Sequence, residues 1–108
     1  MIDVCISIGS NMNERAVQLE RAIDLTGERI GEVLAKSSFY ETSSWGFESE
    51  PFLNAVILVK TAESPYKCLE VSLEIESELG RTRKEEGYSD RMIDLDILTY
   101  GERLIETR

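Results

Sequence analysis

The sequence predicts an α+β domain with the ferredoxin-like sandwich fold, a four-stranded antiparallel sheet with both helices on one face. Some segments alternate apolar and polar residues with the period of a strand, whereas others repeat apolar residues with the period of a helix. Their order is strand, helix, strand, strand, helix, strand, and each strand–helix–strand half requires a right-handed crossover. With 108 residues, 42% of them hydrophobic, the chain is expected to form one domain over residues 1–108.

The first half of the chain contains a predicted strand, a helix and a second strand. Residues 3–8 alternate between apolar and small side chains, and Gly9 is expected to end that strand. Asn11, with an acid three residues later, resembles a helix N-cap and predicts a helix from about residue 13 to 29. Residues 33–42 are rich in β-branched, aromatic and small residues and predict the next strand.

The second half repeats the pattern in the order strand, helix, strand. Residues 52–61 form a nearly continuous apolar run, which is typical of a central strand. Ser64 and the proline after it are a cap and first-turn pair for a helix that is expected to stop at Gly80. Residues 92–100 predict a last strand, which two acids interrupt.

The overall composition excludes several classes of protein. A net charge of −9 argues against broad binding to nucleic acid or to an anionic membrane, because both require a basic surface. The chain has neither an apolar run long enough for a membrane span nor a signal-peptide pattern, so a cytoplasmic location is expected. Cys5 and Cys68 lie on apolar segments without metal-ligand spacing and are expected to be buried free thiols.

Asp94 and Asp96 are the most informative acids of the sequence. Alternate residues of a strand share a face, so both carboxylates should point one way while Leu95 points into the core. Two acids on an apolar strand repel each other unless a cation neutralises them, and Mg²⁺ prefers such oxygen ligands. The alternative is that both acids simply line the solvent face of an edge strand.

Basic residues gather just before these acids. Arg81, Arg83, Lys84 and Arg91 fall within eleven positions of a charged stretch that has no apolar pattern. Guanidinium groups bind phosphate in a bidentate manner, so this stretch could close over a nucleotide. A solvated charged loop is the alternative. A P-loop is excluded, because residues 9–15 lack its second glycine and its lysine.

A polar residue and two aromatic residues suggest a place for a planar ligand. Asn54 lies within an apolar strand, where its amide needs a partner such as a neighbouring loop or the edge of a heterocycle. Trp45 and Phe52 lie in or beside the loop before that strand and could stack on a ligand, although packing in the core is the usual role of such aromatics.

Five segments of the sequence together resemble the family of 6-hydroxymethyl-7,8-dihydropterin pyrophosphokinase, a folate-pathway enzyme. The resemblance spans nearly the whole chain in the right order, and its most specific part is the motif R-x-x-D-L-D followed by two hydrophobic residues. The segments are ISIGSN at 6–11, SSFYET at 37–42, FLNAV at 52–56, ELGRTR at 78–83 and DRMIDLDILTYG at 90–101.

The resemblance implies transfer of the β,γ-diphosphate of ATP to the hydroxymethyl group of a reduced pterin, with release of AMP. It implies that Asp94 and Asp96 hold two Mg²⁺ ions. The residues that it places at the nucleotide are Glu76, Arg81, Arg83 and Arg91. The residues that it places at the pterin are Thr42, Ser43, Trp45, Phe52 and Asn54.

The sequence also departs from the family pattern. The family continues beyond the equivalent of Arg108 through a His-Pro segment and an Arg-x-Phe, so the resemblance implies a domain without that C-terminal segment. The alternative function is therefore a non-catalytic homologue that keeps the fold and binds a nucleotide, a pterin or a protein partner. Apolar surface left uncovered by the shorter chain makes a homodimer an expectation.

Overall fold

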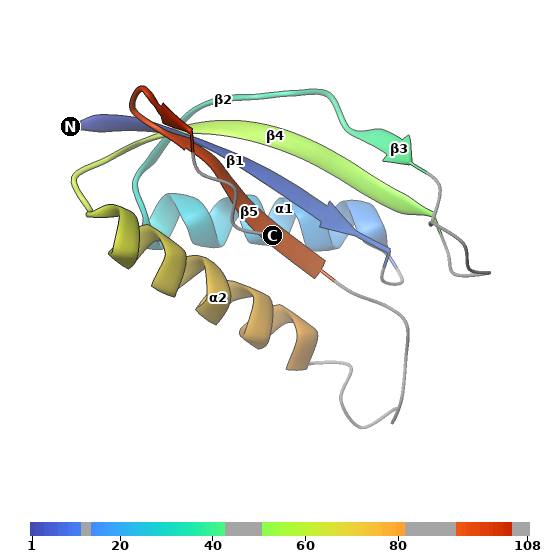
Figure 1. The fold of residues 1–108 in the computed structure, drawn as a ribbon. Coiled ribbons are helices and arrows are strands. Elements are labelled where there is room, and N and C mark those ends of the chain that lie inside the picture. The colour runs from blue at the N-terminus through green and yellow to red at the C-terminus, as the bar shows by residue number, and fades with distance from the viewer. Residues whose placement is uncertain (12–13, 43–50, 82–92, 105–108) are drawn as a thin grey trace.

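Figure 1 shows the computed structural model, in which the helices lie on one face of a curved sheet. The structure describes residues 1–11, 14–42, 51–81 and 93–104, and for residues 81 and 104 it describes the backbone alone. The helices are α1 (Arg15–Arg29) and α2 (Pro65–Arg81). The strands are β1 (Ile2–Ser10), β2 (Glu32–Lys36), β3 (Tyr40–Thr42), β4 (Phe52–Thr61), β5 (Ile93–Tyr100) and β6 (Arg103–Leu104).

The sheet has the strand order β2-β4-β1-β5-β6, and β3 also pairs with β4. All of these pairs are antiparallel. The strands β2, β4, β1 and β5 follow the order of a ferredoxin-like sandwich, and both helices lie on one face (Figure 1), so the predicted fold is confirmed. The predicted number of four strands is wrong, because the described residues alone form a sheet of six strands.

The first extra strand arises from an irregularity in the predicted strand 33–42. The pairing of β2 with β4 shifts its register between Val33 and Ala35. Ser37 then bridges to β4, since its N–H donates to the Val56 carbonyl at 2.9 Å and its hydroxyl accepts the Val56 N–H at 2.9 Å. A side chain thus replaces part of the backbone ladder, and β3 begins only at Tyr40.

The second extra strand follows the turn at Gly101. This glycine has a φ of 61°, a left-handed conformation that glycine adopts without steric cost. The chain then returns along β5, where Arg103 pairs with Tyr100 and Leu104 pairs with Thr99. The expected strand end at residue 100 is therefore the middle of a short hairpin.

The start of α1 differs from the prediction. The helix begins at Arg15, and its cap residue is Glu14, which has a φ of 59° and makes no side-chain cap hydrogen bond. Asn11, the predicted cap, lies at the end of the sheet with 1% of its surface exposed. The cap pattern was recognised correctly only for α2, where the Lys67 N–H donates to the Ser64 hydroxyl at 3.1 Å.

The core lies between the sheet and the helices. Its apolar side chains come from alternate positions of β1, β4 and β5 and from one stripe of each helix. Those with no exposed surface are Val4, Ile6, Ile8, Leu19, Ala22, Ala55, Val59, Cys68 and Ile75. No helix in the described ranges is long and apolar enough to cross a membrane.

The two cysteines are free and lie in different environments. Cys68 is buried in the core, as predicted, and this burial raises the pKa of its thiol. Cys5 is only half-buried, so the prediction of a buried thiol is wrong at this position. Its neighbours Val4 and Ile6 point into the core, and Cys5 therefore lies on the other face of β1.

Candidate active site

Asp94 and Asp96 lie on the face of β5 that points away from the helices. Ile93, Leu95 and Ile97 are 7%, 3% and 1% exposed and belong to the core, whereas both aspartates between them are half-buried. The predicted common face of the two carboxylates is confirmed. The strand period alone produces this separation, because successive side chains point to opposite faces.

The pairing of the strands sets these acids in a row with polar and small residues. Gly9 of β1 pairs with Asp94 on one side and with Asn54 of β4 on the other. Ser7, two residues earlier in β1, pairs with Asp96. Neighbouring strands are about 4.8 Å apart, so Asn54 and Asp94 lie roughly 10 Å from each other with only a glycine between them.

Gly9 is a site residue that the sequence-based interpretation missed. It was expected to end the first strand, but β1 continues to Ser10. A Cβ atom at Gly9 would lie 2.7 Å from the Asn54 Oδ1 and 3.4 Å from the Phe52 ring. The missing side chain is therefore what lets the Asn54 amide lie over β1. A glycine inside an alternating strand is the signal that could have revealed this close approach.

Asn54 contacts two other residues of the predicted pterin side, Thr42 and Phe52. Its Nδ2 donates to the Thr42 hydroxyl at 3.0 Å and to the Tyr40 carbonyl at 3.2 Å, and it makes a longer contact of 3.5 Å with the Phe52 carbonyl. The amide thus fixes β3 against β4, which is the structural alternative considered from the sequence. The same contacts also orient the Asn54 Oδ1 over Gly9.

Arg15 supports this end of the sheet and was not singled out from the sequence. Its guanidinium forms an ion pair with Glu41 of β3 at 2.8 Å and donates to the Pro51 carbonyl at 2.9 Å. One side chain of α1 therefore ties together the end of β3 and the start of β4. These are the segments that carry Thr42 and Phe52.

Glu76 approaches the acidic pair from α2. Its Oε2 accepts the backbone N–H of Leu95 at 2.6 Å, and Leu95 is the residue between the two aspartates. Burial raises the pKa of the Glu76 carboxyl, the bond from Leu95 lowers it, and the charges of Asp94 and Asp96 raise it further; the net effect is a raised pKa. The two aspartates therefore act on the Glu76 carboxyl at this end of β5.

The remaining predicted residues have little or no description in the structure. Ser43, Trp45, Arg83 and Arg91 lie outside the described residues, and so does the predicted nucleotide-closing stretch after residue 81. Arg81 is the last residue of α2. The described positions on this face thus form two groups: Thr42, Phe52 and Asn54 at one end of the row, and Asp94 and Asp96 at the other. Glu76 reaches the second group from α2, through the backbone N–H of Leu95.

The donor chemistry of the acidic pair fits Mg²⁺. Within the described ranges, no three acidic, histidine or cysteine side chains converge to form a metal-binding group, so a metal site here would rest on Asp94 and Asp96 alone among these side chains. Mg²⁺ binds through one or two carboxylates and keeps waters and substrate phosphates as its other ligands. Two carboxylates on an accessible face meet that requirement, whereas a closed all-protein site would need more ligands.

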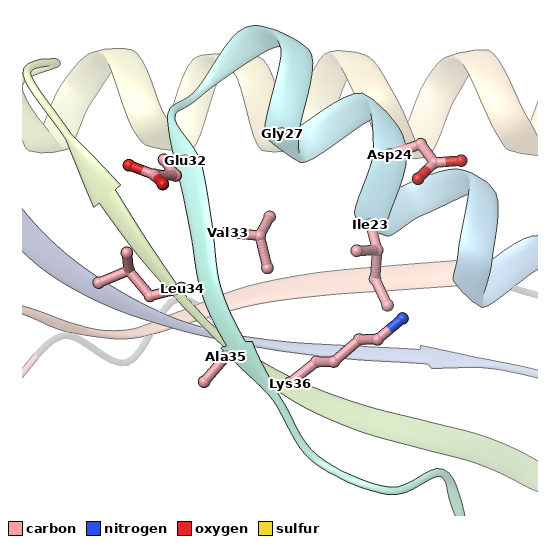
Figure 2. Close-up of a pocket in the computed structure, with 8 residues that line it drawn as sticks. All are labelled: Ile23, Asp24, Gly27, Glu32, Val33, Leu34, Ala35 and Lys36. Atoms are coloured by element: carbon pink, nitrogen blue, oxygen red, sulfur yellow. The ribbon is translucent and has the colours of Figure 1, made fainter.

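A groove between α1 and β2 lies at the opposite edge of the sheet from β5. It is open and has a volume of about 570 Å³. Figure 2 shows Ile23 and Val33 pointing into it and the Lys36 side chain extending from β2 toward α1. Lys36 also forms an exposed 3.7 Å ion pair with Glu20. None of the predicted site residues lines this groove, so it does not belong to the candidate active site.

Fold and site define a ferredoxin-like α+β domain that carries a pair of carboxylates on β5 and, on the same face, a cluster around the Asn54 amide of β4. A sequence model described as "7,8-dihydro-6-hydroxymethylpterin-pyrophosphokinase (HPPK)" matches residues 5–107. The chain therefore belongs to the 7,8-dihydro-6-hydroxymethylpterin-pyrophosphokinase family, and the resemblance noted in the sequence is confirmed.

Curated relatives support this family over nearly the whole chain. The 2-amino-4-hydroxy-6-hydroxymethyldihydropteridine pyrophosphokinase of Porphyromonas gingivalis is 46% identical over 104 residues, which are 94% of this chain and 71% of the relative. The enzyme of the same name from Bacillus subtilis is 40% identical over 94% of this chain and 62% of its own length. That from Haemophilus influenzae is 36% identical over 98% of this chain and 67% of its own length.

Solved structures of fused HPPK-DHPS proteins share the fold. One in complex with substrates has a TM-score of 0.75 at 17% identity, over 96% of this chain and 29% of the other. A Plasmodium falciparum HPPK-DHPS triple mutant with pteroate has a TM-score of 0.72 at 19% identity, over 96% of this chain and 28% of the other. The chain thus spans less than a third of these fused proteins and about two thirds of its curated relatives.

Proposed function

We propose that the chain transfers diphosphate from ATP to 6-hydroxymethyl-7,8-dihydropterin and releases AMP, as a step of folate biosynthesis. Membership of the family and the names of relatives that are 36–46% identical support this function. The single structural observation that carries it is the row across the sheet. That row sets the Asn54 amide and the Asp94 carboxylate on either side of Gly9.

The acidic end of the row is proposed to hold the nucleotide. Asp94 and Asp96 would bind two Mg²⁺ ions, which would screen the triphosphate from an acidic protein and withdraw charge from the β-phosphorus. The proposed nucleotide-side residues are Glu76, Arg81, Arg83 and Arg91. The arginines suit this role because a guanidinium group binds phosphate oxygens in a bidentate manner.

The amide end of the row is proposed to hold the pterin. Asn54 and Thr42 provide polar atoms suited to the edge of a heterocycle, and Phe52 provides an aromatic surface beside them. Ser43 and Trp45 complete the proposed set. A ligand bound in this place has Gly9 beneath it, where the lack of a side chain leaves room for close approach of the backbone.

The reaction requires the hydroxymethyl oxygen to attack the β-phosphorus while the bond from that phosphorus to the α,β-bridging oxygen breaks. The diphosphate moves to the pterin, the hydroxyl proton is released, and AMP leaves. The contribution of this chain is mainly positioning, because rigid strands hold the two substrate groups at a fixed separation. In the proposed geometry both substrates bind on the same face of the sheet, so the hydroxymethyl oxygen can approach the β-phosphorus along that face.

Four further expectations remain part of the proposal. Residues 1–108 act as a single pyrophosphokinase-like domain, in the cytoplasm, with small-molecule substrates. A homodimer is also expected, and the outer side of α2 offers exposed apolar surface for it, with Tyr66 86% and Leu73 55% exposed. Sedimentation velocity over a range of protein concentrations tests the dimer, and a single monomeric species throughout would contradict it.

Calorimetry and a product assay test the function directly. We expect ATP to bind far more tightly with Mg²⁺ than with EDTA, because the acids repel an unscreened triphosphate. Incubation with Mg·ATP and hydroxymethyldihydropterin should then yield AMP and the diphosphorylated pterin. Binding of both ligands without AMP would favour the non-catalytic alternative. Equal affinity for ATP with Mg²⁺ and with EDTA would remove the metal-binding role of the acids.

A further inference from the structure

The edge of β5 next to α2 has an unusual partner. On one side β5 pairs with β1 along most of its length, but on the other side the described residues of β6 pair with Thr99 and Tyr100 alone. The N–H of Leu95 instead reaches the Glu76 carboxylate of α2 at 2.6 Å. An edge N–H needs such a partner, and a bond this short is typical of a charge-assisted hydrogen bond.

This bond fixes the peptide unit that joins the first metal-binding acid to the next residue. The Leu95 N–H belongs to the planar peptide group between Asp94 and Leu95, so holding it restricts rotation of the backbone on which the Asp94 side chain stands. Leu95 is only 3% exposed and is anchored in the core as well. The acid-bearing segment is thus held by its core side chains, by pairing with β1, and by Glu76 at its outer edge.

We propose that Glu76 is a positioning residue for the metal site, which acts through its hydrogen bond to the Leu95 N–H to hold Asp94 and Asp96 in a geometry that binds a divalent cation. The inference rests on the proposed function, because that function assigns the cation to the two aspartates. Partners that orient the ligands of a metal typically contribute 10-fold to 100-fold to its affinity. Glu76 is therefore expected to affect cation binding without contacting the cation.

A purely structural role for Glu76 makes a different prediction. In that case the bond would only seal the edge of β5 against α2, and its loss would lower stability while leaving the cation affinity of the folded protein unchanged. If Glu76 acted only through its negative charge, replacing it by a neutral acceptor would weaken cation binding as much as removing the acceptor. Two substitutions at Glu76 separate these three roles.

The experiment measures binding of Mn²⁺, a spectroscopic substitute for Mg²⁺, by electron paramagnetic resonance in the absence of substrates. Glu76→Gln keeps an oxygen acceptor and removes the charge, whereas Glu76→Leu removes the acceptor at similar size. Glu74→Leu is the matched control, because Glu74 is an exposed acid of the same helix. We expect about a tenfold weaker affinity for Glu76→Leu, a loss of no more than about threefold for Glu76→Gln, and no change for Glu74→Leu.

The possible outcomes separate the inference from the function on which it rests. Wild-type affinity in a folded Glu76→Leu variant, or equal losses in both Glu76 variants, would overturn the positioning role. A wild-type protein that binds no Mn²⁺ would contradict the proposed metal site itself. If Glu76→Leu does not fold, amide exchange in the wild type decides: we expect Mg²⁺ to slow exchange of the Leu95 N–H, and an unchanged rate despite bound Mg²⁺ would overturn the inference.

Discussion

The two faces of the central sheet are made from the same strands but differ in what they contribute. On the helix-facing side, Ile6, Ile57 and Ile97 are at most 1% exposed and contribute to a continuous core. On the outer side, the neighbouring positions carry Gly9, Asn54, Asp94 and Asp96. Because side chains alternate along a strand, one stretch of backbone can provide both stability and a binding surface. Substitutions on the two faces should therefore affect different measurable properties.

The largest expected effect is on stability and comes from the core face. Ile57→Ala should lower the free energy of unfolding by about 2–5 kcal/mol, because it leaves a cavity where a fully packed side chain stood. Urea unfolding measures this loss. Leu58→Ala removes the same number of carbon atoms from the next residue, which is half-buried on the outer face, and is the control. Equal losses in both variants would contradict the assignment of the two faces.

The next largest effect is on nucleotide binding and comes from the acidic end of the outer face. Asp96→Asn should weaken binding of Mg·ATP at least tenfold, or by about 1.4 kcal/mol or more, because one of two metal-binding carboxylates is lost. Titration calorimetry measures the change. Asp24→Asn makes the same change of charge on an exposed position of α1 and should have no such effect. A similar loss of affinity in both variants would mean that net charge, and not metal binding by Asp96, causes the effect.

A smaller effect is expected at the amide end. Gly9→Ala would place a methyl group 2.7 Å from the Asn54 Oδ1, so the amide must move while the strand can remain. Affinity for the pterin should fall about fivefold to tenfold, in keeping with a cost of about 1 kcal/mol for an overpacked contact. Fluorescence titration with the pterin measures it, and affinity for Mg·ATP serves as the internal reference.

Gly27→Ala is the matched control for that substitution. A Cβ at Gly27 meets only Val33, at an ordinary distance of 3.6 Å, and the position belongs to α1. Pterin affinity should be unchanged in this variant. An unaltered affinity in Gly9→Ala as well would show that the Asn54 amide does not need its present orientation for the ligand.

The smallest effect concerns the pH dependence of stability and comes from Glu76, which links α2 to the edge of β5. The pKa of Glu76 is raised in the folded state, chiefly by burial, so the charged form costs stability above that pKa and the cost disappears as the pH falls below the unfolded value. Glu76→Gln should therefore be more stable than the wild type at neutral pH, and the difference should shrink in acid. Thermal unfolding between neutral and acid pH measures it, and a difference that grows in acid would contradict the sign.

Much of the architecture could be read from local patterns. The alternation over residues 3–8, the apolar run 52–61 and the Ser-Pro start of the second helix each depend on neighbouring residues alone, and the structure has elements at all three places. The common face of Asp94 and Asp96 follows from the same period of two. Five short segments, of which the motif around these acids is the most specific, also indicated the family that the comparisons confirm.

Other features depended on residues that are distant in sequence. Ser37 interrupts a predicted strand because it bonds to Val56 across the sheet, and no pattern within residues 33–42 contains that partner. Gly9 was read as the end of a strand, although its place between Asn54 and Asp94 requires a glycine inside one. The Glu76 carboxylate reaches Leu95 only because α2 packs against β5.

The sequence by itself thus determined the order of the two helices and the four strands of the sandwich, the class of fold and the common face of the two acids, because each depends on periodicity or on a short motif. Tertiary structure decided which side chains meet: Asn54 over Gly9, Glu76 on the Leu95 N–H, and Arg15 between Glu41 and the start of β4. The physical reason is that strand register and helix docking are set by the packing of the whole core. A one-residue shift in register would move every one of these contacts.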